Sequence, residues 1–97
     1  MKMKDVDYYI AKRDKNLARI KAIDRMLKRY KQNKSVKWNP SPESLEKERN
    51  ALAEDVLGYN AIIASLESGI RLARYHNYRQ AFAILNREYQ ADRRAKE

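Results

Sequence analysis

The chain has 97 residues, 36% of them charged, with only two Gly and two Pro, and its formal net charge is +9. Its shortness excludes a large core, and its composition favours long helices over sheets. The absence of cysteine excludes disulfides and thiolate metal sites, and no apolar run approaches the roughly 20 residues that span a bilayer. We expect a soluble, cytoplasmic, all-α protein with no membrane segment.

The positive charge is concentrated at the start of the chain. Residues 1–38 hold 13 Lys and Arg against 4 Asp, whereas residues 39–97 hold 9 Lys and Arg against 9 Asp and Glu. This asymmetry predicts an acidic or polyanionic partner for the first third.

A first helix is predicted over residues 5–33, with Asp5 as its N-cap. Arg13 and Asp14 interrupt its apolar stripe, so we expect the first two turns to pack less tightly than the rest. The apolar positions are Val6, Tyr9, Ile10, Leu17, Ile20, Ile23, Leu27 and Tyr30.

Residues 34–41 form the predicted linker. Pro40 and Pro42 push the residues before them out of the helical region. Ser41 is then a suitable N-cap, with Pro42 at the first helical position. A short connection between two long helices predicts an antiparallel hairpin.

The second helix, predicted over residues 42–74, carries a heptad seam interrupted only by Arg49. We expect Gly58 and Gly69 to belong to a second face of mostly small residues that receives a third element. Glycines tolerated on a solvent-exposed face are the alternative. The seam comprises Leu45, Leu52, Val56, Tyr59, Ile63, Leu66, Ile70 and Ala73, and the second face also holds Ala53, Leu57, Ala61, Ala64 and Ser68.

The apolar pattern changes phase at residues 75–77, which predicts a break and a third helix over residues 78–94. This helix either folds back on the hairpin or is exchanged with a second copy in a homodimer. A continuous bent helix is the alternative.

Catalytic chemistry is not indicated. His76 is the only histidine, so a two-histidine zinc site cannot form within one chain. A thin helical hairpin also offers little concavity for a catalytic carboxylate pair. We expect a protein that is not an enzyme and needs no cofactor or metal.

The strongest binding signal is the predicted end of the hairpin, where cations alternate with aromatic residues. Such a surface suits phosphates and stacked bases, or equally an acidic protein groove. Alternatively, the aromatic residues close the core while the lysines are solvated. The candidate residues are Arg25, Lys28, Arg29, Tyr30, Lys31, Lys34, Lys37, Trp38, Pro40 and Pro42.

A small, basic, helical, cysteine-free chain with the linker Trp-Asn-Pro-Ser-Pro (residues 38–42) resembles the temperate-phage anti-RecBCD proteins of the Abc type. This resemblance covers the overall character of the chain and carries no diagnostic motif. It implies binding to the RecC subunit of the host RecBCD helicase-nuclease, altered nuclease behaviour and Chi recognition, and protection of phage DNA ends for recombination. A basic chain cannot mimic DNA, so inhibition would require docking on the enzyme's surface.

Two other classes of function remain open. One is a basic nucleic-acid-binding protein, and the other is a structural coiled-coil protein that self-associates. The bonds preceding Pro40 and Pro42 also predict a switchable loop on which a host prolyl isomerase could act.

Overall fold

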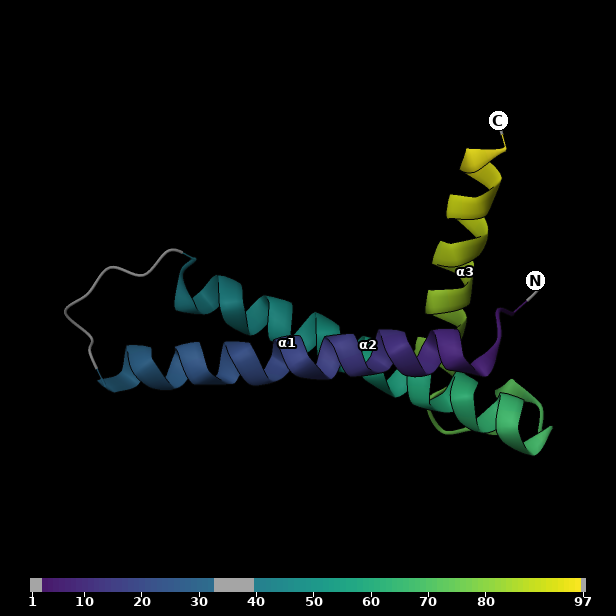
Figure 1. The fold of residues 1–97 in the computed structure, drawn as a ribbon, viewed down its shortest axis with the longest axis horizontal. Helices are drawn as coiled ribbons and strands as arrows, with labels where there is room; N and C mark the ends of the chain where they lie inside the picture. The colour runs from purple at the N-terminus through teal and green to yellow at the C-terminus, as the bar shows by residue number, and fades with distance from the viewer. Residues whose placement is uncertain (1–2, 33–39, 97) are drawn as a thin grey trace.

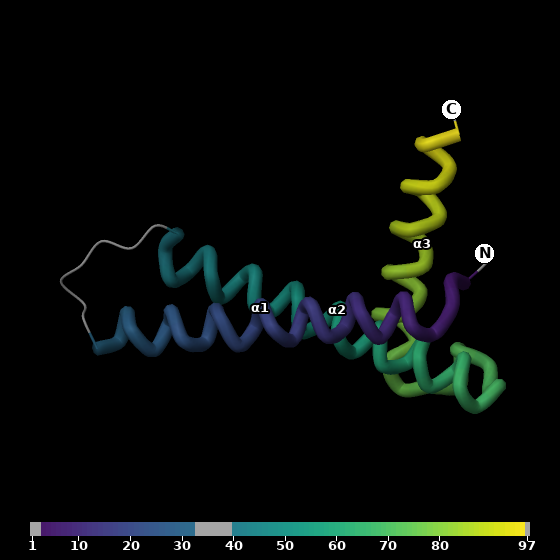
Figure 2. Tube along the Cα trace, viewed as in Figure 1, coloured from purple at the N-terminus to yellow at the C-terminus, as the bar shows by residue number. Residues whose placement is uncertain are grey.

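The computed structural model describes residues 3–32 and 40–96. Their helices are α1 (Val6–Gln32), α2 (Pro42–Ser68), a 3₁₀ turn η1 (Leu72–Arg74) and α3 (Tyr78–Ala95). Helices α1 and α2 run antiparallel as a long hairpin, and α3 starts at one end of the hairpin and rises across it (Figure 1). The Cα trace in Figure 2 follows the same path. The predicted all-α hairpin with a third helix packed against it is confirmed.

Helix α1 packs tightly at its start, contrary to expectation. Asp5 caps it by accepting a hydrogen bond from the backbone N–H of Tyr8 at 3.0 Å. Tyr9, one turn later, has 0% of its surface exposed. The Tyr9 side chain contacts both α2 and α3. The residue pattern of α1 alone does not reveal the contact with α3.

The contact face of α1 differs from the predicted stripe. Steps of four and three from Tyr9 pass through Arg13 and Asn16, so Leu17 falls outside the face and is 40% exposed. Arg13 lies toward α2, where its Nη1 donates to Asn60 Oδ1 at 3.2 Å. Arg13 therefore belongs to the contact face and does not interrupt it.

Helix α2 starts as predicted, with Pro42 at its first position. The Ser41 hydroxyl accepts from the backbone N–H of Ser44 at 3.2 Å. The predicted end of this helix at residue 74 is wrong, because α2 ends at Ser68 and Gly69 adopts a left-handed conformation with φ of 75°.

The turn after α2 is stabilised by its own hydrogen bonds. The N–H of Gly69 donates to the Ser65 carbonyl at 2.9 Å, and the Ser65 hydroxyl donates to the Ile70 carbonyl at 2.6 Å. The last two positions of the predicted seam therefore do not belong to it, since Ile70 is 47% exposed and Ala73 is also exposed.

The third element arrives on the α2 face that contains Gly58. Gly58, Ala61 and Ser65 are buried on this face, so the expected role of small residues is confirmed around Gly58, whereas Gly69 serves a turn. Leu57 on the predicted second face stays 39% exposed.

The core lies mainly where α3 meets the hairpin. Toward the other end of the hairpin, the buried apolar side chains among the described residues are Ile23 and Leu45. None of the described helices has an apolar stretch long enough to cross a membrane. The main core cluster comprises Tyr9, Ala61, Ile62, Ile63, Leu72, Ala81, Ile84 and Leu85.

Candidate partner-binding surface

The predicted binding residues fall into three groups. Arg25, Lys28, Arg29 and Lys31 are all exposed on the last turns of α1. Tyr30 is half-buried beside them, Pro40 is exposed and Pro42 is half-buried as the first residue of α2. The predictions for Lys34, Lys37 and Trp38 lie outside the described residues.

The cations at this end of α1 differ from those in its middle. Arg19 pairs with Glu48 of α2 in a two-pronged contact, with Nη2 at 3.1 Å from Oε1. The hydrogen bond from Arg19 lowers the pKa of the Glu48 carboxyl below its usual value. Both side chains are exposed, so this pair orients the helices rather than adding much stability.

Asp24, the last carboxylate of α1, is already bound. Arg49 of α2 donates to it through Nε at 2.6 Å and Nη2 at 3.4 Å. Arg49, which the sequence placed as a polar interruption of the seam, therefore holds the last carboxylate of α1. Within the described residues, Arg25, Lys28, Arg29 and Lys31 form no ion pair.

Lys21 extends this surface, and the sequence analysis did not include it. Lys21, Arg25 and Lys28 are spaced by four and three, which places them on one exposed face of α1. The spacing indicates this face from the sequence alone, but the predicted cluster at the hairpin end begins at Arg25 and does not reach Lys21. We call Lys21, Arg25, Lys28, Arg29 and Lys31 the basic end.

The base of the basic end is firmly held. Ile23 has 0% and Leu45 has 3% of its surface exposed, so each helix contributes one buried anchor below the exposed cations. The Ser41 cap fixes the start of α2 on the other side. This arrangement presents several positive charges on a rigid helix face.

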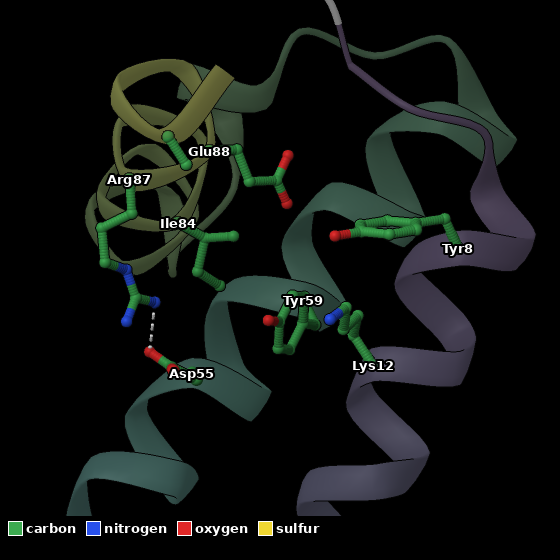
Figure 3. Close-up of a pocket in the computed structure, with 8 residues that line it drawn as sticks. Tyr8, Lys12, Asp55, Tyr59, Ile84, Arg87 and Glu88 are labelled. Atoms are coloured by element: carbon green, nitrogen blue, oxygen red, sulfur yellow. Dashed lines mark hydrogen bonds and ion pairs between the residues drawn. The ribbon is translucent and has the colours of Figure 1, made fainter. Parts of the chain in front are cut away.

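A shallow cleft of about 250 Å³ opens at the other end of the hairpin, where α3 meets α1 and α2 (Figure 3). Asp55 Oδ1 accepts from Arg87 Nη2 at 2.8 Å on one side of it. On the opposite side, Glu88 accepts from the Tyr9 hydroxyl at 2.9 Å and lies 3.6 Å from Lys4 Nζ. The lining residues are Tyr8, Lys12, Asp55, Tyr59, Ile84, Arg87, Glu88 and Ala91.

The charged groups of this cleft have partners, which favours a structural joint over a reactive site. Burial of the phenol, reinforced by the Glu88 carboxylate, raises the pKa of Tyr9 to about 12. A phenol with that pKa stays protonated near neutral pH. The described residues also contain no group of three or more His, Cys, Asp or Glu side chains placed to hold a metal ion.

The arrangement thus offers a basic surface for binding and a polar joint that positions α3. Comparison with family models, curated proteins and solved structures found no match for this chain.

Proposed function

We propose that this protein is a non-catalytic helical adaptor that binds an acidic surface of a partner protein through its basic end. The observation that carries the proposal is the set of exposed cations toward the end of α1 that have no ion-pair partner among the described residues, beside an Asp24 already engaged by Arg49. Unpaired cations on a rigid helix can complement a partner's carboxylates without first breaking internal pairs, which favours fast, oriented association.

The resemblance to phage anti-RecBCD proteins supplies the first partner to test, the RecC subunit of RecBCD. Sites that attract DNA phosphates are basic, and they would repel a chain with a net charge of +9. We therefore place its docking on an acidic outer surface of the enzyme, from which it would alter nuclease activity and Chi recognition.

Binding of the labelled chain to purified RecBCD, followed by fluorescence anisotropy, tests the proposal. Replacing Lys28, Arg29 and Lys31 with Gln should weaken binding by roughly tenfold or more, because each exposed cation loses its partner contact. A matched control removes the same charge elsewhere, with Lys15, Arg71 and Arg74 changed to Gln. These control residues are exposed and lie away from the basic end.

An equal loss of affinity in both triple variants would mean that only the net charge matters, and it would overturn the proposal of a defined docking surface. Absence of binding by the wild-type chain would remove RecBCD as the partner. Circular dichroism of each variant excludes unfolding as the cause.

Nucleic acid is the second candidate for the basic end, because the same unpaired cations can neutralise phosphates. It is distinguished by titrating single-stranded and duplex oligonucleotides at two salt concentrations. Binding through several phosphate contacts would fall by roughly three orders of magnitude or more between 50 and 200 mM salt. If the wild type shows this salt-dependent binding and the basic-end variant shows none, DNA or RNA replaces the protein as the proposed partner.

A further inference from the structure

The cleft in Figure 3, which we call the three-helix cleft, is lined by side chains from all three helices. Tyr8 of α1 and Tyr59 of α2 each bring a phenol to it, and Figure 3 shows both hydroxyls pointing toward α3. Within the described residues, neither hydroxyl takes part in a hydrogen bond, because the contacts of both side chains are made by their rings. The cleft therefore holds two hydrogen-bond donors without an acceptor.

Lys12 adds a positive charge to the same cleft. Among the described residues its ammonium has no carboxylate within ion-pair distance. Its contact is with the ring of Tyr8, whose centroid lies 5.4 Å from Lys12 Nζ. Such a contact involves the face of the ring and leaves N–H groups of the ammonium able to donate to another acceptor.

The carboxylates of the cleft, in contrast, are already engaged. Asp55 accepts from Arg87 at 2.8 Å, and Glu88 accepts from the Tyr9 hydroxyl at 2.9 Å. A cationic ligand would compete with these internal bonds, whereas an anionic ligand would meet donors that lack an acceptor. Burial, reinforced by the charge of Asp55, raises the pKa of Tyr59, so its hydroxyl stays protonated and able to donate near neutral pH.

The size and the charge of the cleft restrict the anion further. Its volume of about 250 Å³ is below the roughly 300–1,000 Å³ of sites for drug-sized ligands, so a compact molecule is required. The buried Ile84 and Ala91 give it an apolar wall. The single ammonium of Lys12 balances one negative charge, whereas a phosphate monoester carries about 1.5 to 2.

We propose that the three-helix cleft binds a small organic carboxylate with a compact apolar body. The carboxylate accepts from Lys12 Nζ and from the hydroxyls of Tyr8 and Tyr59, while the apolar body lies against Ile84. Hydrogen bonds from a charged donor to a carboxylate are among the strongest in proteins, which suits a site this shallow. The proposal uses none of the residues of the basic end, so either proposal can fail without the other.

Titration of the whole ¹⁵N-labelled chain with benzoate, followed by NMR, provides the test. Saturable shifts are expected at the amides of the residues that line the cleft, with a Kd of about 1 mM or lower for a ligand of this size. Benzamide, the neutral isostere, should bind at least tenfold more weakly, because it lacks the charge that Lys12 complements. Inorganic phosphate at equal ionic strength should also bind more weakly, because it lacks an apolar body.

Two substitutions assign the donors. Lys12→Gln should weaken benzoate binding at least fivefold, whereas Lys15→Gln should leave it unchanged. Lys15 is a matched control, because it is exposed on the same helix, carries the same charge and does not line the cleft. Tyr59→Phe keeps the ring, removes only the hydroxyl and should weaken binding by roughly threefold or more. Circular dichroism of each variant verifies that the helices are intact.

Several results would overturn the inference. Shifts centred on the basic end would show that benzoate follows the net charge and not the cleft. Equal binding of benzamide or of phosphate would remove the carboxylate or the apolar body from the proposed ligand. Equal loss of affinity in Lys12→Gln and Lys15→Gln, or an unchanged affinity in both Lys12→Gln and Tyr59→Phe, would remove the donors that define the site.

Discussion

Gly58 of α2 lies directly beneath Ile84 of α3, so close that a Cβ at position 58 would stand 2.6 Å from Ile84 Cδ1. The same Cβ would be 2.7 Å from the backbone carbonyl oxygen of Gln80. The Ile84 methyl could rotate away, but the Gln80 backbone cannot move without shifting α3. The absence of a side chain at this position therefore sets the distance between the two helices.

Gly58→Ala should consequently destabilise the protein despite the better helix propensity of alanine. Overpacking costs about 1–3 kcal/mol, against a propensity gain of about 1 kcal/mol, so we expect a net loss of about 1 kcal/mol. Urea denaturation measures this loss directly. A Gly58→Ala protein more stable than the wild type would show that α3 does not pack here.

Gly69 tests the opposite situation, in which space is available but the backbone is unusual. A Cβ there would meet nothing within 4 Å, yet φ is 75°. Gly69→Ala should cost about 1–2 kcal/mol because of the left-handed conformation, and Gly69→Asn should cost less because Asn tolerates that region. Thermal denaturation of the two variants gives the order, and equal stability of all three proteins would contradict the assigned end of α2.

Tyr9→Phe removes the hydroxyl that bridges α1 to Glu88 and to the backbone N–H of Lys4. We expect a loss of about 1.5–3 kcal/mol, since the bond to a carboxylate is charge-assisted. Denaturant titration measures it, with Tyr89→Phe at an exposed tyrosine as the control. A neutral Tyr9→Phe substitution would mean that water replaces the hydroxyl.

The same hydroxyl predicts a dependence of stability on alkaline pH. Its pKa is raised to about 12 in the folded protein, whereas an unperturbed tyrosine has a pKa of about 10. Between these values the folded state holds a proton that the unfolded state has lost, so stability is retained below about pH 10 and falls as the pH rises toward 12. Denaturation midpoints from pH 8.5 to 11.5 should fall more steeply for wild type than for Tyr9→Phe, and parallel profiles would contradict the prediction.

Ile23 and Leu17 provide a paired test of the α1 contact face. Ile23→Ala should cost about 2–4 kcal/mol because Ile23 is fully buried. Leu17→Ala should change stability by less than about 1 kcal/mol, since Leu17 is 40% exposed and alanine favours helix. Melting temperatures report both changes, and similar losses of stability would mean that Leu17 belongs to the α1 contact face.

The helix starts were predictable because local chemistry determines them. The Ser41 hydroxyl caps α2, whose first residue is Pro42, and the Asp5 carboxylate caps α1. The presence of Gly58 on a face of small residues likewise indicated a third element. These signals need no knowledge of distant residues.

The end of α2 was not predictable from periodicity, because the heptad pattern continues through Ile70 and Ala73 after the helix has stopped. Gly69 was the available signal, since glycine is the usual residue beyond a helix C-terminus. The burial of Tyr9 depends on Glu88, and nothing near Tyr9 in the sequence indicates this partner. At the basic end, the exposed cations of α1 other than Lys21 were foreseen, whereas the engagement of Asp24 by Arg49 required the register of the hairpin.

The bond between Tyr9 and Glu88 joins residues 79 positions apart. During synthesis from the N-terminus, Tyr9 leaves the ribosome well before Glu88 has been added to the chain. Helices α1 and α2 can therefore pair while the tyrosine hydroxyl still lacks its carboxylate acceptor. Completion of the native structure then waits for the final helix, and a chain that ended before residue 88 would leave the end of the hairpin by α3 open.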